Sequence, residues 1–426
     1  MEQSLRPALL VDDGDWSTLV TRPTSLALPA ARGWFLRLLF VTVVIQTAVY
    51  VVRPMVSYQA LALGADNTQL GLVAGAYASL SLFVAVPIGR WVDRWGELLF
   101  VFLGGAVIGG VALSLVFIHS LVALAISQAA LGFGHIACVV GSQTLVANQG
   151  PPEERDARFG LFTVAVSTGQ LIGPALGGLL GGSGGAGFDG TLVFGTTAAL
   201  TLPGVLLAIW MWRRTARPPR AHPEPTRPRE SSWRATHRVL RIPSMPHAMI
   251  ASLTVLTTID LIAVYLPAYG EAHGMAVETV GLLLAVRAAA SMASRLLMLR
   301  LIRWLGRKRL LLASIVLPAL ALLVLPFLEA PVALGIVLLV AGLGLGLGQP
   351  VTLSWVADRA PRDVRGLAIG VRLSGNRFGQ VVLPLGVGVI AGGAGLTAAF
   401  IAMGAMLGGS AAAVLGADFG STEAEL

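Results

Sequence analysis

Residues 99–118 read LFVFLGGAVIGGVALSLVFI, a stretch without a charged side chain. A helix that crosses the hydrocarbon core of a bilayer needs about 20 mostly apolar residues, and this segment has that length. The whole chain of 426 residues has the same character, because it is 55% hydrophobic and only 12% charged, with a mean hydropathy of +0.78. Soluble proteins carry about 25% charged residues. The sequence therefore predicts an integral membrane protein.

Similar apolar runs recur along the chain on both sides of this segment, about twelve in all. We therefore expect an all-α polytopic membrane protein, with about twelve transmembrane helices in two pseudo-symmetric six-helix bundles. The expected spans are 33–57, 70–89, 99–118, 122–146, 159–182, 191–212, 247–270, 277–298, 309–328, 333–356, 365–389 and 393–416. Residues 1–32 contain no apolar stretch suited to a signal peptide, so we expect the first span to stay in the mature protein.

The basic residues predict the orientation of these spans. All but five of the 30 lysines and arginines fall in alternate loops that share a side with the two termini. Cytoplasmic loops are enriched in lysine and arginine, so both termini are expected in the cytoplasm, with the protein in the plasma (inner) membrane. This topology also accounts for the net charge of +8, and nucleic-acid binding is not expected.

The chain is expected to divide into five parts. A cytoplasmic tail (1–32) precedes the N-terminal bundle (33–212), and a cytoplasmic linker rich in Arg and Pro (213–245) leads to the C-terminal bundle (246–416) and a second cytoplasmic tail (417–426).

Glycines repeat between the two bundles at two spacings. The first, called the main repeat below, relates Gly64, Gly71 and Gly96 to Gly274, Gly281 and Gly306. The second is slightly shorter, lies in the fifth span, and relates Gly160, Gly169 and Gly173 to Gly366, Gly375 and Gly379. Duplicated bundles of this kind are typical of transporters.

The loop after the second expected span reads Gly89-Arg90-Trp91-Val92-Asp93-Arg94-Trp95-Gly96-Glu97. It resembles the GxxxDRxGRR signature that the major facilitator superfamily carries between its second and third helices. The resemblance implies that Gly89 allows close helix packing, that Asp93 and Arg94 are the conserved charges and that Gly96 turns the chain. It also implies that Asp93 holds the cytoplasmic side closed near Arg365. Glu97 departs from the signature, which usually has a basic residue there.

The fifth expected span carries a second motif. Its small residues fit the pattern G(x)8G(x)3GP(x)2GG and are Gly160, Gly169, Gly173, Pro174, Gly177 and Gly178. This resembles the antiporter motif of the twelve-helix drug:proton antiporters of the same superfamily. The resemblance implies proton-coupled export of a small organic compound by alternating access, without a cofactor. The superfamily's RxxQGxG pattern is only partly present, because Gln128 stands in place of its arginine, and His135 is the candidate to compensate.

Ionisable residues inside a span are costly and usually serve pairing or function. Asp260 is the one carboxylate near the middle of an expected span, and Arg287 lies at the same depth in the next span, each about 15 Å from the outer face. We expect the two to pair and to carry the coupling proton, with His135 as a further proton-coupling candidate. A purely structural ion pair is the alternative.

The expected substrate site contains more arginine than carboxylate. By resemblance, helices 1, 4, 7 and 10 line a central cavity, to which the eleventh adds two residues. The expected substrate-binding residues are Tyr50, Arg53, His135, Gln143, Gln349, Asn376 and Arg377. Surplus arginines favour an anionic substrate, so transport of an organic anion, including uptake, is the alternative function. Asn376 and Arg377 capping backbone carbonyls of neighbouring helices is a third interpretation, and Arg372 is expected to snorkel towards water.

Enzyme classes are disfavoured by what the sequence lacks. Its single cysteine excludes a multi-cysteine metal site, and its single lysine, Lys308, rules out a GxxxxGK[ST] phosphate loop. A membrane-embedded enzyme would need a nucleophile with a base or a metal cluster, and His135 and Asp260 have no such companions. We therefore expect no enzyme, no catalytic residue, no metal and no cofactor. The expected partners are a small molecule, protons and the lipid bilayer, with the protein as a monomer.

Overall fold

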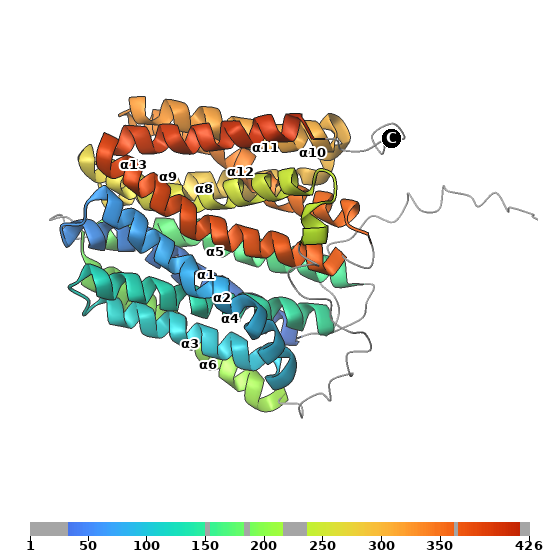
Figure 1. Cartoon of the computed structure of the whole chain (residues 1–426). Coiled ribbons are helices and arrows are strands. Elements are labelled where there is room, and N and C mark those ends of the chain that lie inside the picture. The colour runs from blue at the N-terminus through green and yellow to red at the C-terminus, as the bar shows by residue number, and fades with distance from the viewer. Residues whose placement is uncertain (1–32, 150–153, 183–187, 216–236, 362–364, 418–426) are drawn as a thin grey trace, which may run out of the picture. The chain divides into compact units, whose positions relative to one another are not determined.

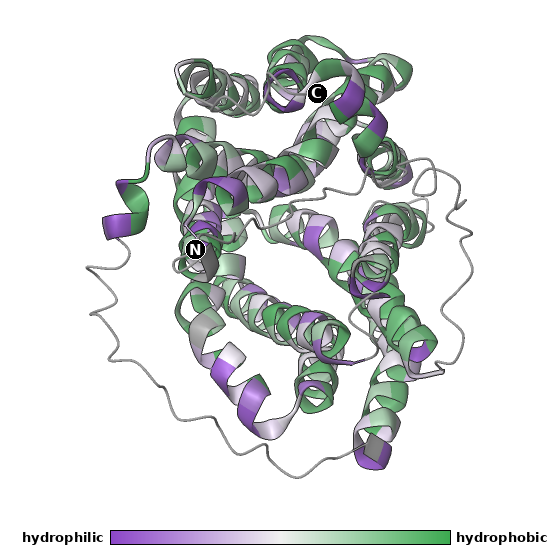
Figure 2. Cartoon of the chain, turned by 90° about the vertical axis from the view of Figure 1, so that its right-hand side faces the viewer, coloured by the Kyte–Doolittle hydropathy of each residue, from purple (hydrophilic) through white to green (hydrophobic). Residues whose placement is uncertain are grey.

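The computed structural model describes residues 33–149, 154–182, 188–215, 237–361 and 365–417 (Figure 1). Most of the expected tails and linker lies outside these residues. The described residues form helices and no strand, which confirms the all-α prediction. Along the helices hydrophobic residues dominate, and hydrophilic residues gather towards the helix ends (Figure 2).

The described residues of the first half form six α-helices. They are α1 (Gly33–Ala62), α2 (Asn67–Trp95), α3 (Glu97–Leu115), α4 (Leu121–Asn148), α5 (Arg155–Gly182) and α6 (Gly190–Thr215). The second half contains α8 (Met245–Ala272), α9 (Val277–Leu296), α10 (Met298–Leu305), α11 (Arg307–Val324), η3 (Leu325–Phe327), α12 (Pro331–Arg359) and α13 (Arg365–Leu415).

Among the described residues, eleven helices are long and apolar enough to cross a membrane. The last of them, α13, contains two of the expected spans, because its backbone leaves the helical region at Gly395 (φ 83°). A residue with a Cβ rarely adopts such a φ, so glycine permits the chain to turn there without a loop. The twelve expected spans are thereby confirmed, and most observed helices extend a few residues beyond the predicted ends.

The main repeat is visible in the backbone. Gly64 and Gly274 follow α1 and α8 with φ of 80° and 64°, while Gly96 and Gly306 precede α3 and α11 with φ of 94° and 75°. In both halves glycine therefore ends a helix in a conformation that other residues avoid.

The two halves contact each other through two equivalent helix pairs, α2 with α13 and α5 with α9. Gly71 leaves no room for a Cβ beside the Pro384 carbonyl and Gly388, and Gly281 leaves none beside the Pro174 carbonyl and Gly178. The main repeat converts one contact into the other, since it relates Pro174 to Pro384 and Gly178 to Gly388. Small residues allow this close approach of backbones in a membrane protein.

The shorter spacing predicted for the fifth span is therefore wrong. The main repeat relates Gly169 to Gly379 instead, and these two glycines have equivalent neighbours. Gly169 packs on Gln46 and Thr47 of α1, and Gly379 packs on Leu253 and Thr257 of α8. The shorter spacing is a coincidence of a chain with 51 glycines.

The glycine motif of α5 brings this helix close to α1 and α9. Gly173 contacts Tyr50, Gly177 contacts Met55, and Gly178 contacts Gly281. Gly160, by contrast, has no neighbour within 4 Å of the place where a Cβ would lie. The motif therefore acts as a packing surface over its second part only.

Gly281→Ala should destabilise the arrangement in which α5 and α9 touch. The added Cβ would lie 2.6 Å from the Pro174 carbonyl oxygen, and neither backbone can yield without moving its helix. We expect a loss of about 1 to 3 kcal/mol, typical of overpacking, in thermal unfolding of the purified protein. Gly110→Ala is the matched control, because no atom lies within 4 Å of its Cβ position. Equal unfolding temperatures of the two variants would contradict this interpretation.

Candidate functional site

Asp260, in the middle of α8, joins the two halves of the chain through a buried ion pair. Its Oδ1 lies 2.5 Å from Arg53 Nη1 of α1, and both side chains are only 8% exposed. Its Oδ2 accepts a hydrogen bond from the Gln380 amide of α13. Both oxygens of Asp260 therefore have a partner, which offsets the cost of burying a charged carboxylate.

The predicted pairing of Asp260 with Arg287 is wrong. The two residues were placed at one depth by counting along their helices, but counting leaves the rotation of each helix undetermined. In the structure α9 packs mainly on α12 and α5, and the Arg287 carbonyl lies against Gly342 of α12. Arg287 is 3% exposed, and its Nε has no hydrogen-bond partner among the described residues.

A polar chain leads from Arg53 into the first half. The Arg53 guanidinium lies over the ring of Tyr77 in α2, 4.3 Å from its centroid. The Tyr77 hydroxyl and His135 Nδ1 of α4 are hydrogen-bonded at 2.5 Å, and His135 Nε2 lies 3.1 Å from Gln46 Oε1 of α1. Because an amide oxygen only accepts, Nε2 carries a proton in this arrangement, and Nδ1 accepts the hydrogen bond from Tyr77. His135 therefore orients the ring on which Arg53 rests.

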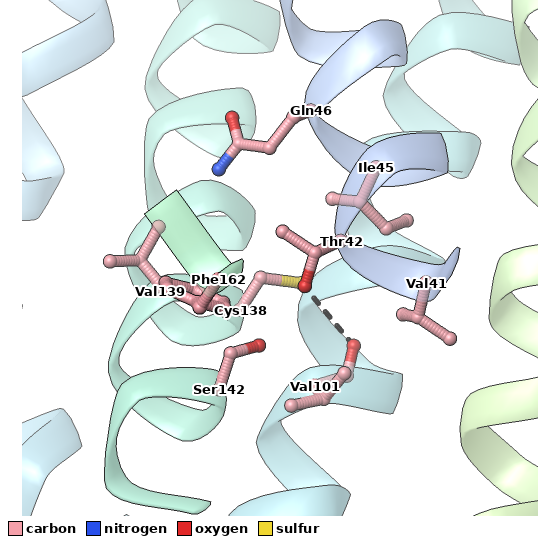
Figure 3. Close-up of a pocket in the computed structure, with 9 residues that line it drawn as sticks. All are labelled: Val41, Thr42, Ile45, Gln46, Val101, Cys138, Val139, Ser142 and Phe162. Carbon is pink, nitrogen blue, oxygen red and sulfur yellow. Dashed lines mark hydrogen bonds between the residues drawn. The ribbon is translucent and has the colours of Figure 1, made fainter. Parts of the chain in front are cut away.

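Gln46 also borders a small cavity beside this chain (Figure 3). The cavity has a volume of about 10 Å³, and Cys138 lines it while donating a hydrogen bond to the Val101 carbonyl at 3.3 Å. A volume of this size holds about one water molecule. It is too small for an organic substrate in this conformation.

The two halves place equivalent glutamines on different acceptors. Gln170 of α5 donates to the Tyr50 hydroxyl at 2.9 Å, and Gln380 of α13 donates to Asp260. The main repeat relates Gln170 to Gln380 and Tyr50 to Asp260. At the same structural position the first half thus has a neutral phenol and the second half an ionisable carboxylate. Neither glutamine was predicted as a site residue, although the repeat that relates them is present in the sequence.

A second polar cluster surrounds Gln349 of α12. Its amide donates to the Ser252 carbonyl at 2.7 Å, and Arg372 donates to both the backbone carbonyl and the side-chain oxygen of Gln349 at 2.9 Å. Asn376 joins through its Oδ1, which accepts from the Ser252 hydroxyl at 2.9 Å. Arg372 is 3% exposed, so the prediction that it snorkels is wrong, because acceptors inside the bundle bind its guanidinium.

The remaining predicted residues lie in different surroundings. Arg377 donates to Gln380 Oε1 at 2.9 Å and so belongs to the Asp260 cluster. Neither Asn376 nor Arg377 bonds a backbone carbonyl among the described residues, whereas Arg372 does. Gln143 is exposed and joins neither cluster.

Arg295 of α9 is a further cation inside the bundle, half-buried, although the sequence favours a place for it at a cytoplasmic loop. Its Nε donates to the Gly346 carbonyl at 3.0 Å, and its Nη1 donates to Ser167 of α5 at 3.0 Å. Pro350 has no N–H to offer to the carbonyl four residues earlier, which is that of Gly346. Arg295 therefore satisfies an acceptor that the proline leaves free, and it links α9 to both α12 and α5.

The residues that resemble the superfamily signature were expected in a loop, but residues 89–95 form the last turns of α2, which ends at Gly96. Asp93 and Arg94 both face outward, and Arg94 lies over Trp95 at 5.8 Å from the ring centroid. Gly96 turns the chain with φ 94°, and Glu97 accepts a hydrogen bond from Asn148 at 2.9 Å. The predicted contact of Asp93 near Arg365 falls outside the described residues, because the Arg365 side chain is not among them.

Known proteins resemble this chain in both sequence and fold. Multidrug resistance protein 1 of Bacillus subtilis (strain 168) is 23% identical over 325 residues, which cover 74% of this chain and 80% of that protein. The Multi-drug resistance efflux pump PmrA homolog of Lactococcus lactis is 25% identical over 342 residues, covering 78% and 82%.

Solved transporter structures share the arrangement of the helices. The nucleoside transporter NupG matches with a TM-score of 0.74 at 14% identity, over 89% of this chain and 98% of that one. A bacterial homolog of the human lysosomal transporter Spinster, in an inward-facing and unoccupied conformation, matches with a TM-score of 0.70 at 17% identity, over 89% and 95%. The family model described as Major Facilitator Superfamily matches residues 38–371 and 248–419. With its twelve spans, its internal repeat and this match over most of its length, the chain belongs to the major facilitator superfamily.

Proposed function

We propose that the protein exports a small organic compound in exchange for protons, by alternating access across the plasma membrane with both termini in the cytoplasm. The observation that carries the proposal is the ion pair between Asp260 and Arg53, because it places a buried titratable group between the two halves. The names of the Bacillus and Lactococcus relatives and the complete glycine motif of α5 support export.

The ion pair supplies a way to couple protons to movement. While Asp260 is charged, its attraction to Arg53 holds α8 against α1, and separating the two charges inside the membrane would leave each without a partner. A proton on Asp260 removes the negative charge, so that the halves can separate at lower cost. A substrate that competes with the proton for this site would then be exchanged for it.

The equivalent position in the first half explains why one carboxylate is enough. Tyr50 stands where the second half has Asp260, and its hydroxyl accepts the hydrogen bond from Gln170. The proposed proton therefore acts at Asp260 and on its pair with Arg53. His135 and Tyr77 keep Arg53 oriented in the meantime.

The proposal is tested with purified protein in proteoliposomes. A panel of cationic, neutral and anionic fluorescent compounds is offered under an imposed pH difference, and accumulation against a concentration gradient is followed. We expect protons to move opposite to the compound. The lumen should become more alkaline when the compound enters it and more acidic when the compound leaves it. Accumulation that does not respond to the pH difference would overturn proton coupling.

Transport of an organic anion is the second candidate, because arginines outnumber carboxylates around Asp260. Arg53 pairs with Asp260 directly, Arg377 is linked to it through Gln380, and the buried Arg287 interacts with it electrostatically from α9. Arg287 is the cation whose Nε lacks a partner among the described residues, and a carboxylate of the substrate would supply one. Protonation of Asp260 would also release Arg53 for the anion, so that proton and anion would bind together and move in the same direction.

Arg287→Gln separates these candidates. If the guanidinium binds the substrate, the variant should lose about 1.5 to 3 kcal/mol of affinity for carboxylate-bearing compounds while binding neutral analogues as before. Arg300→Gln is the control, since Arg300 is exposed on α10, outside the Asp260 cluster. Binding is measured by ligand-induced thermal stabilisation of the purified protein. An equal loss for charged and neutral compounds would assign Arg287 a structural role.

The proposed orientation and the monomeric state are open to direct measurement. Cys138 is the single cysteine and is buried, so Cys138→Ala provides a cysteine-free background. Single cysteines introduced at the exposed positions Asp93 and Arg94, near the end of α2, should then react with an impermeant reagent only from the cytoplasmic side. The mass of the purified protein in detergent tests the monomer.

A further inference from the structure

A cavity of about 230 Å³ lies where α1 and α3 begin and α4 and α6 end. Its floor is apolar and consists of Leu98, Leu145 and Met211, which are 7%, 1% and 4% exposed. These side chains come from three helices, so the packing of the bundle fixes the shape of the floor. The cavity does not include the residues of the Asp260 cluster.

The rim of the cavity is cationic and aromatic. The Trp210 ring near the end of α6 contacts two guanidinium groups, that of Arg37 at 4.7 Å and that of Arg214 at 4.6 Å from its centroid. Both arginines are exposed, and among the described residues neither forms an ion pair. Trp34 and Gln149 complete the rim.

The contact with Trp210 leaves the donors of these arginines available to an anion. A cation–π contact makes no use of the N–H groups of a guanidinium as hydrogen-bond donors. The ring holds both guanidinium groups at the rim of the cavity, and phosphate accepts bidentate hydrogen bonds from arginine. The rim therefore has the chemistry of a phosphate site, while the floor has that of a site for hydrocarbon.

The predicted topology places this cavity at the cytoplasmic surface of the membrane. The side that holds the termini is the one where α1 begins and α6 ends, and tryptophan prefers this interfacial depth. Basic pockets between helices on that side bind the head groups of anionic lipids. We propose that this cavity binds the phosphate of an anionic phospholipid from the cytoplasmic leaflet, with the glycerol and upper acyl chain on the apolar floor.

The proposal is tested on the full-length protein in detergent. Phosphatidylglycerol and phosphatidylcholine are titrated separately, and binding is followed by native mass spectrometry and by thermal stabilisation. We expect a preference for phosphatidylglycerol, which the double variant Arg37→Gln/Arg214→Gln weakens about 30-fold, because each arginine contributes about a factor of five near an anionic lipid surface. Arg214→Gln alone, at an exposed helix end, should weaken binding about fivefold and keeps the test valid if the double variant does not fold.

Arg213→Gln is the matched control. Arg213 is the neighbouring arginine in the same helix turn, is exposed and does not line the cavity, so this variant should keep the preference for phosphatidylglycerol. Equal weakening by Arg213→Gln and Arg214→Gln would overturn the proposal, since it would indicate a diffuse effect of charge. Inorganic phosphate that protects the protein as well as the lipid does would also overturn it, because a free anion makes no use of the apolar floor. Transport activity enters none of these measurements.

Discussion

Asp260→Asn is expected to abolish transport against a gradient while preserving exchange down a gradient. The amide resembles the protonated carboxyl group in size and lacks its charge, so the variant should behave as if the proton never left. In proteoliposomes with an imposed pH difference, the accumulation ratio of the transported compound should fall to about one, because no coupling free energy remains between proton and substrate. Glu271→Gln, at an exposed carboxylate near the end of the same helix, should accumulate the compound normally.

Continued accumulation by the Asp260→Asn variant would show that the pair with Arg53 is structural. The coupling proton would then have to be sought at His135, which the polar chain connects to Arg53 through Tyr77. Loss of both uphill transport and downhill exchange would also count against the prediction, because a neutral side chain at this position should still allow the halves to move.

Arg53→Gln should be the most destabilising of the substitutions considered. It removes the cation from a buried carboxylate and leaves Asp260 with the Gln380 amide alone. Breaking a buried ion pair in this way costs about 3 to 5 kcal/mol, because the remaining charge has no compensation. Adding Asp260→Asn to the same chain should recover most of the loss, and Arg377→Gln should cost much less, since Arg377 is only half buried.

The pH dependence of these variants gives an independent check. In the Arg53→Gln variant the deficit relative to the parent should shrink as the pH falls, since a protonated Asp260 no longer needs a cation. The double variant should show no such change. Chemical unfolding of the purified proteins at several pH values measures both. A double variant as unstable as Arg53→Gln would indicate that the guanidinium matters through packing and not through charge.

The helices were predictable because length and hydropathy alone determine which segments can cross a membrane. The break between the last two spans was expected at 390–392 and lies at Gly395, a few residues further on, since a turn made by a single glycine leaves no polar loop in the sequence to mark its position. The expected spans 365–389 and 393–416 therefore appear as one helical element with a kink. The burial of Arg372 was also not predictable. Its acceptors on Gln349 and Thr352 come within reach only when α12 and α13 pack together.

The sequence predicts the depth of Asp260 in the membrane but not the residue with which it pairs. Counting along the chain placed Asp260 correctly in the middle of a helix, but its partner depends on how α1, α8 and α9 are rotated about their axes. One residue of helix corresponds to about 100° of rotation, so a pair at equal depth can face apart. Gln380 carries no charge, so the cost of burying a charge in the membrane does not single it out, although the main repeat relates it to Gln170.

The depth of Asp260 also has an electrical consequence. The residue lies about halfway along α8 (Met245–Ala272), so a proton that reaches it from either surface crosses roughly half of the membrane potential. That corresponds to about 1.1 kcal/mol for each 100 mV. A voltage of about 100 mV therefore acts on the occupancy of this carboxylate as strongly as a change of about 0.8 pH units. Asp260 would respond to the energised state of the membrane even where the two aqueous phases have the same pH.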